Sequence, residues 1–273
     1  MPQRFRRPKP EWARPASAGG SELALVTAVA DDLAPLVQQR RFLRDVAPCV
    51  HHVVVVDDLA RARASELLAS DPDVTLLEVA REDFTIGRAR NVGASAAIAR
   101  GCDGFINLGV VSMPLPGFVE AYREAFMVCD HSRGWLFNGP ITYLAAEDDL
   151  TTMTQARASA LVDPHPRRAF PPPGDVHVNA DHRLFLAENF AVRVREWRML
   201  GGFCPDYRDP VIGDLDLALR AEQAGFMMAW VGGAHVLHAP SSSSGSAVDD
   251  LAVFTRRWGR EPADQEFVTR TSA

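Results

Sequence analysis

The chain has 273 residues, of which 47% are hydrophobic and 23% are charged, a composition typical of a folded globular protein. Its 29 basic and 35 acidic residues give a formal net charge of -6 and an isoelectric point of about 5.8. This balance excludes a general electrostatic attraction to nucleic acid or to an anionic membrane, so a phosphate-bearing ligand needs a local cluster of groups.

The cysteines and the two ends of the chain give expectations about compartment and domains. Four widely spaced cysteines without a Cys-x-x-Cys pair predict reduced thiols in a cytoplasmic protein. Residues 1–20 are basic and proline-rich and lack an apolar core, which predicts a disordered arm and neither a signal peptide nor a membrane span. We expect one domain over residues 21–260, with a nucleotide-binding half at 21–116 and an acceptor half at 117–260, followed by a tail at 261–273.

Strand-like and helix-like segments alternate in the first half of the chain. Short apolar or β-branched runs predict strands at residues 22–32, 51–58, 73–80 and 102–111. Helices are predicted at residues 33–46, 59–70 and 84–101. This alternation predicts an α/β fold with right-handed crossovers, a mostly parallel sheet and ligands at the carboxyl ends of the strands.

The second half has a different pattern. Residues 117–130 predict a helix, residues 134–144 one strand with a Gly-Pro bend, and residues 147–163 a helix or irregular structure. The run at 164–175 is too rich in proline for regular structure and long enough for a mobile active-site loop. From residue 185 onward the pattern predicts strand, helix, loop, helix and strand.

Several motifs occur in an order that resembles the family 2 glycosyltransferases. A strand ends in Asp57-Asp58, the next helix carries Arg-x-Arg-Asn-x-Gly at residues 88–93, and a later strand ends at Pro114. The segment "NFAVRVREWRMLGGF" then precedes "GDLDLALRAEQAGF", and the "RMLGGF" part with the acids after it is the most specific match. The resemblance covers roughly residues 23–259. It implies the GT-A fold, a mostly parallel central sheet flanked by helices, and a nucleotide-sugar donor.

The same resemblance implies a nucleotide site at the ends of the first strands. Thr27 and Ala30 would face the nucleotide, and one carboxylate of Asp57 and Asp58 would accept a hydrogen bond from the base. The two acids can instead cap the helix that follows them, since their side-chain oxygens accept hydrogen bonds from backbone N–H groups.

The helix motif implies contacts with the diphosphate. Arg88 or Arg90 would face it, because guanidinium groups present fixed donors to phosphate oxygens, although an arginine on a helix is usually only solvated. Asn91 would cap or position the adjoining turn.

The stretch "FINLGVVSMPLPGF" lacks the acids that the resemblance leads us to expect. The family carries an Asp-x-Asp before the proline, and this pair helps to hold a divalent cation against the diphosphate. Counting back from Pro114 places Gly109 and Val111 at the two acidic positions, and an alignment from Asn107 still leaves Gly109 at the second. The Asp-x-Asp motif is therefore degenerate. Mg²⁺ and Mn²⁺ prefer oxygen ligands, and neither glycine nor valine has a side-chain oxygen, so we expect weakened binding of either metal.

Two later motifs supply further candidate residues. Asp214 takes the place of the family's general base, and its alternative role is an N-cap for the helix that follows. Asp216 is expected to stabilise the first turn of that helix. His238 matches a late histidine that binds the metal or the diphosphate in relatives, whereas a lone histidine after a strand is usually structural. The serine run at 241–244 predicts a flexible loop.

Three functions are considered, of which one, a different transfer reaction at the same site, has no specific support in the sequence. The other two compete. The first is an inverting glycosyltransferase that moves a sugar from a nucleotide-sugar to a small soluble acceptor, such as a metabolite or natural product, with Asp214 as base. Cationic side chains would replace the metal of the Asp-x-Asp motif, and the candidates are Arg88, Arg90, His238 and Arg167 or Arg168. The second is a catalytically inactive protein of the same fold that binds nucleotide or a partner enzyme. The missing acids favour the second function, and Asp214, His238 and the Asp57-Asp58 pair favour the first.

Overall fold

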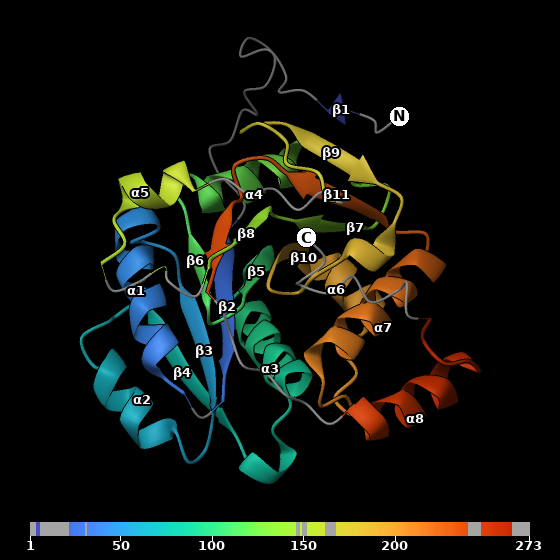
Figure 1. Cartoon of the computed structure of the whole chain (residues 1–273), viewed down its shortest axis with the longest axis horizontal. Coiled ribbons are helices and arrows are strands. Elements are labelled where there is room, and N and C mark those ends of the chain that lie inside the picture. The colour runs from blue at the N-terminus through green and yellow to red at the C-terminus, as the bar shows by residue number, and fades with distance from the viewer. Residues whose placement is uncertain are drawn as a thin grey trace.

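The computed structural model of the chain describes residues 4–5, 22–30, 32–145, 148, 152–161, 168–239 and 247–263. Most of the expected arm at 1–20, residues 164–167 of the proline-rich run, the serine run at 241–244 and most of the tail lie outside these residues. Helices flank both faces of a large central sheet (Figure 1).

The described residues form two sheets. The larger has nine strands in the order β1-β9-β11-β7-β10-β5-β2-β3-β4. These strands are β1 (Arg4–Phe5), β2 (Leu23–Val29), β3 (His52–Asp57), β4 (Val74–Val79), β5 (Gly104–Leu108), β7 (Trp135–Asn138), β9 (Val176–Asn179), β10 (Asn189–Arg193) and β11 (Met227–Val231). The smaller sheet has the order β6-β12-β8, with β6 (Ser112–Pro114), β8 (Ile141–Tyr143) and β12 (Val236–His238).

Eight helices are present in the described residues. They are α1 (Ala34–Val46), α2 (Arg61–Leu68), α3 (Ile86–Ala99), α4 (Phe118–Val128), α5 (Gln155–Ala160), α6 (Val194–Leu200), α7 (Pro210–Gln223) and α8 (Ala247–Trp258), with short 3-10 turns η1 (Arg81–Asp83) and η2 (His182–Leu184). Helices α3, α6 and α7 share one apolar core with the strands, and α1 and α4 contribute to a second core on the opposite face. In Figure 1, α3 lies in front of the sheet, with α6 and α7 beside it.

Strand direction changes at the middle of the large sheet. Strands β4, β3, β2 and β5 pair in parallel, as strand-helix alternation requires. Strand β10 is antiparallel to both of its neighbours, β5 and β7. The segment that precedes β10 therefore lies at the edge where β5 ends, so the second half of the chain meets the carboxyl ends of the first half's parallel strands.

Close packing fixes α3 on the sheet. A Cβ atom on Gly93 would stand 2.3 Å from Cγ1 of Val26 and 3.3 Å from Cγ2 of Val55, so only glycine permits this approach. The residues on either side of Val26 in β2 turn to the opposite face, where Leu25 joins the other core. Thr27, on that same face, points toward α1.

Most predicted elements are confirmed, and the main difference lies between residues 134 and 144. The single strand expected over 134–144 is wrong, because β7 and β8 belong to different sheets. At the break, a Cβ atom on Gly139 would stand 1.9 Å from the carbonyl oxygen of Ala234, and Pro140 has no N–H to continue a ladder. A strand ends at Pro114, as the motif order predicted, but it is the separate strand β6 of the smaller sheet. Strands β1 and β9 and helix α8 were not predicted. The expectation of a disordered arm is wrong for Arg4 and Phe5, which form β1 and pair with β9.

Candidate functional site at the end of strand β5

The first contact at this site is between Gly109, just after β5, and Glu188, just before β10. The Gly109 N–H donates to the Glu188 carbonyl oxygen over 2.9 Å. Oε2 of Glu188 lies 1.7 Å from the position that a Cβ atom on Gly109 would take. The carboxylate of Glu188 thus fills the space of the side chain that position 109 lacks.

Arg90, Glu188 and Asp214 form an ionic group that we call the Arg90 cluster. Arg90 Nη1 lies 2.9 Å from Oδ1 of Asp214, and Nη2 lies 3.4 Å from Oε1 of Glu188. The guanidinium also lies over the ring of Phe203, 5.2 Å from its centroid. All three charged side chains are largely buried, and together they carry one net negative charge when both acids are ionised.

Asp214 has a second contact that ties the cluster to the segment before β10. Its Oδ2 accepts a hydrogen bond of 2.9 Å from the N–H of Ala187. The alternative of an N-cap is wrong, because α7 begins at Pro210 and Asp209 caps it by accepting from the N–H of Val211. Asp214 therefore lies inside the helix and points toward α3 and the N–H of Ala187.

The expected role of Asp216 as a first-turn acid is also wrong. Asp216 is fully buried within α7 and accepts hydrogen bonds from Arg220, Arg257 and Trp258. The hydroxyl of Tyr207 donates to Asp216 over 3.4 Å, and burial, then the Asp216 charge, raise the pKa of that tyrosine well above its ordinary value of 10. Asp216 joins α8 to α7.

His238 lies beside the turn that follows β5. Its Nδ1 is 3.1 Å from Oγ of Ser112, and the next residue, Ala239, donates its N–H to the carbonyl oxygen of Val111. The ring of Tyr143 stands 5.3 Å from the His238 ring. The structure therefore brings Gly109, Val111 and His238 to one place, as the resemblance implies.

Arg168 contacts Tyr143, whose ring lies against His238. Its Nη1 donates to the hydroxyl of Tyr143 over 3.2 Å, and its side chain is largely buried. Arg167 lies outside the described residues. Of the two arginines that the proline-rich run offers, Arg168 therefore approaches His238 through Tyr143.

A buried hydrogen-bond chain holds the turn between Gly109 and Ser112. Gln39 of α1 donates to the carbonyl oxygens of both residues, over 2.7 and 3.0 Å, and accepts from the hydroxyl of Thr27. His52 lies 2.9 Å from that hydroxyl. The side chain of Thr27 is fully buried by these contacts, so its nucleotide contact stays a prediction.

The direction of this chain follows from the donor groups. Arg40 Nη1 lies 3.1 Å from Nδ1 of His52 and can only donate, so Nδ1 accepts and Nε2 donates to Thr27. Complete burial, and then the Arg40 charge, lower the pKa of His52 well below 6.5, which agrees with a neutral ring.

Asp57 and Asp58 make the contacts expected of a turn. Asp57 Oδ1 accepts from the N–H of Ala60, the residue that caps α2, and Oδ2 pairs with Arg81 over 3.1 Å. Asp58 accepts from the N–H of Arg81. These contacts support the capping alternative, and a contact with the base stays a prediction. Ala30 is exposed just past the carboxyl end of β2.

Arg88 and Asn91, both on α3, have different surroundings. Arg88 is 3.6 Å from Asp83 and is partly exposed. Asn91 accepts from the N–H of Phe203 and donates to its carbonyl oxygen, both over 2.8 Å, so it positions the turn of the Gly-Gly-Phe motif. This turn places the Phe203 ring against Arg90.

Sequence reasoning missed Glu188 and Gln39. Glu188 directly precedes the segment "NFAVRVREWRMLGGF" that carries the resemblance, and no motif includes it. Its position opposite Gly109 depends on the register of β10 against β5, which local patterns do not give. In the sequence pattern, Gln39 is one polar residue of an amphipathic helix. In the structure it is fully buried.

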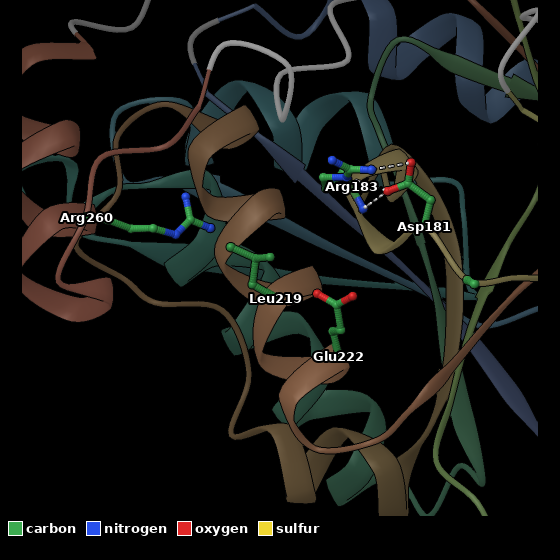
Figure 2. Close-up of a pocket in the computed structure, with 6 residues that line it drawn as sticks. Asp181, Arg183, Leu219, Glu222 and Arg260 are labelled. Carbon is green, nitrogen blue, oxygen red and sulfur yellow. Dashed lines mark hydrogen bonds and ion pairs between the residues drawn. The ribbon is translucent and has the colours of Figure 1, made fainter.

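Two surface pockets are lined by residues outside this site. One, of about 420 Å³, is bounded by Ala180, Asp181, Arg183, Leu219, Glu222 and Arg260 (Figure 2). Figure 2 shows Asp181 and Arg183 facing each other across a two-point ion pair, with Leu219 and Glu222 on α7. The other, of about 370 Å³, is lined by Arg220, Gln223, Arg257 and Trp258. Neither pocket includes a residue of the Arg90 cluster.

Comparisons with known proteins show the fold. No protein-family model and no curated protein matches the chain. It is similar to the crystal structure of GalNAc-T7 with UDP, GalNAc and Mn²⁺, with a TM-score of 0.60 and 12% identity over 89% of this chain and 49% of that one. It is also similar to TarS of S. aureus, with a TM-score of 0.58 and 9% identity over 86% of this chain and 38% of that one.

A third structure gives the same result. The mannosyltransferase PcManGT of Pyrobaculum calidifontis, in complex with GDP-Man and Mn²⁺, has a TM-score of 0.52 and 13% identity over 90% of this chain and 67% of that one. The chain spans about half the length of the GalNAc-T7 structure. None of the described helices has the length and apolar character that a membrane crossing needs. The chain has the GT-A fold that the sequence predicted.

Proposed function

We propose that the chain is an inverting glycosyltransferase, similar to family 2 but with a degenerate Asp-x-Asp motif, that moves a sugar from a nucleotide-sugar to a small soluble acceptor. The observation that carries this proposal is the Arg90 cluster, which joins both halves of the chain at the carboxyl end of β5. Ligands of open α/β sheets bind at this edge. Two proteins of similar fold have structures with UDP or GDP-Man and Mn²⁺, which supports a nucleotide-sugar donor.

Asp214 is the general base in this proposal. The acceptor oxygen forms a bond to the anomeric carbon while the bond from that carbon to the phosphate oxygen breaks and the diphosphate leaves with the electron pair. The acceptor proton passes to the Asp214 carboxylate. A carboxylate has about four lone-pair positions, and the contacts with Arg90 and the Ala187 N–H use two of them.

The nucleotide belongs to the 21–116 half and the acceptor to the 117–260 half. Gly109 and Val111 offer no side-chain oxygen for an Asp-x-Asp metal. Arg90 is committed to two carboxylates, which leaves Arg168 and His238 as the better cationic contacts for a departing diphosphate. The proposal keeps the cytoplasmic setting expected from widely spaced cysteines without a Cys-x-x-Cys pair.

A second function is a catalytically inactive protein that binds nucleotide or a partner enzyme. The absence of acidic side chains at positions 109 and 111 favours it. It requires that the Arg90 cluster serves only to join the two halves of the fold.

Donor hydrolysis in the absence of acceptor distinguishes the two functions. The purified chain is incubated with UDP-, GDP- and dTDP-sugars, and the released nucleoside diphosphate is measured for the wild type, D214N and the control D83N, which changes an exposed acid. We expect one donor class to be hydrolysed, and D214N to lose roughly 100-fold or more of that rate while its affinity for the nucleoside diphosphate stays within about threefold. Full activity in D214N would end its assignment as base, and nucleotide binding without hydrolysis of any donor would favour the inactive protein.

A further inference from the structure

Glu188 and Gly109 are neighbours across two antiparallel strands. The last paired residues of β5 and β10 are Leu108 and Asn189, and the ladder continues through the hydrogen bond from Gly109 to Glu188. Residues directly opposite in an antiparallel pair project to the same face of the sheet. An acid at position 188 can therefore place its carboxylate where the side chain of residue 109 would be.

The carboxylate of Glu188 occupies this space. Oε2 of Glu188 stands 1.7 Å from the position of a Cβ atom on Gly109, and Oγ of Ser112 stands 3.3 Å from the same point. Ser112 is in turn bonded to Nδ1 of His238. Any side chain at position 109 would collide with Glu188, so glycine is required there as long as Glu188 is present.

This oxygen-rich point suits a divalent cation that arrives with a diphosphate. Mg²⁺ is commonly held by one or two protein carboxylates, with phosphate oxygens and waters completing its coordination. Among the described residues, no three His, Cys, Asp or Glu side chains gather closely enough to hold a metal ion. The donor set therefore fits a cation bound through a nucleotide and does not fit an ion held by the protein alone.

The charges of the Arg90 cluster also favour a divalent cation bound with a diphosphate. Its two carboxylates outnumber its one guanidinium, so a diphosphate at this edge would meet net negative charge. The contact of Arg90 with Glu188 is 3.4 Å, against 2.9 Å with Asp214, so the Arg90–Glu188 contact is the longer of the two. A cation between Glu188 and the diphosphate removes the repulsion.

We propose that Glu188 replaces the acid missing at position 109 and binds Mn²⁺ or Mg²⁺ as its complex with a nucleoside diphosphate. The inference rests on the proposed function, because it requires a nucleotide at this edge. In this arrangement the carboxylate of the metal site comes from the segment before β10 instead of from the end of β5.

The test is a titration of the full chain with Mn²⁺, followed by electron paramagnetic resonance of the free ion. It is done with and without UDP, GDP or dTDP, on the wild type, E188Q and the control E120Q, which alters an exposed glutamate on α4. We expect the nucleotide to increase Mn²⁺ affinity in the wild type and in E120Q. E188Q should lose about tenfold or more of that affinity.

A variant with its carboxylate at position 109 instead of 188 distinguishes a metal-binding role of Glu188 from a purely structural role. Gly109 is not among the glycines with a left-handed backbone, so an aspartate is compatible with its conformation once the space is cleared. We expect E188A to lose nucleotide-dependent Mn²⁺ binding and E188A/G109D to regain it in part. A purely structural role of Glu188 predicts no such gain.

Calorimetry of the nucleoside diphosphates in EDTA distinguishes the failure of this inference from that of the proposed function. If a nucleotide binds in EDTA and neither Mn²⁺ nor E188Q changes its affinity, the role of Glu188 as a ligand is wrong and the proposed function stands. If no nucleotide binds with or without Mn²⁺, both are wrong.

Discussion

The two halves of the molecule use their charged and polar groups differently. At the strand ends of the first half, Asp57 pairs with Arg81 and the turn before α2, and Thr27 bonds to Gln39 and His52, all within that half. The second half instead sends Glu188 and Asp214 across to Arg90 on α3.

This difference indicates where buried charges depend on contact between the two halves. Buried charges are retained only when they are paired, and pairs within one half can be satisfied by folding of that half alone. The Arg90 cluster is completed only when residues 124 positions apart in the chain meet. We infer that the first half supplies the platform and that the site arises where the second half joins it.

Breaking the connection between the halves should have the largest effect. R90L leaves Glu188 and Asp214 buried without their shared cation, and we expect the free energy of unfolding to fall by about 3–5 kcal/mol. Urea denaturation measures this loss. R88L, two residues away on the partly exposed side of α3, is the matched control and should cost less than about 1 kcal/mol. Equal losses in the two variants would contradict the special role of Arg90.

Two helical glycines, one in each half, give the next test. G93A drives a methyl group to 2.3 Å from Val26 and should cost about 1–3 kcal/mol. In G213A the nearest atom, on Tyr207, is 3.7 Å from the new Cβ, so the higher helix propensity of alanine should leave stability unchanged or raise it by up to about 1 kcal/mol. A thermal melt of each variant measures the difference. A stable G93A would show that α3 can move away from the sheet.

Each half also buries a neutral histidine, His52 in the first and His235 in the second. Burial lowers the pKa of His235 from 6.5 to about 4. The unfolded chain therefore binds more protons than the folded chain between these values. The stabilisation is complete above pH 6.5 and is lost as the pH falls toward about 4, at up to about 1.4 kcal/mol per pH unit.

Removing one of these histidines isolates its share of the pH dependence. H235Q should flatten the dependence of unfolding free energy on pH between 6.5 and about 4, while the slope from His52 remains. H131N, at an exposed position, is the control. Urea midpoints taken across this range give the slope, and an unchanged slope in H235Q would show that its ring is charged in the fold.

The smallest effect is expected from a pair within the first half. Arg81 is about half exposed where it meets Asp57, so R81A should cost no more than about 1 kcal/mol and less at high salt. Urea denaturation at two salt concentrations measures this. A loss as large as that of R90L would remove the distinction between the two halves.

The sequence could predict elements whose pattern is local. Strand β2 and helix α1 follow from apolar runs and spacing, and the closeness of His238 to Val111 followed from a resemblance in motif order. The Gly-Pro bend was predicted, but the change of sheet at Gly139 was missed because it depends on a carbonyl oxygen contributed by Ala234, far along the chain. Long-range packing of this kind leaves no periodic signal.

The candidate site was predictable only in part for the same reason. Arg90 and Asp214 were both chosen as site residues, but their pairing depends on how α7 packs against α3. Glu188 was missed because its position is set by strand register, and Asp216 was misplaced because the helix begins at Pro210, earlier than the acidic motif suggests.

The most direct test of the central claim is calorimetric titration of the wild-type chain with UDP, GDP and dTDP, first in EDTA and then with Mn²⁺. The account predicts that one nucleoside diphosphate binds and that Mn²⁺ tightens its binding. Absence of binding by all three under both conditions would contradict a nucleotide-sugar site at the Arg90 cluster.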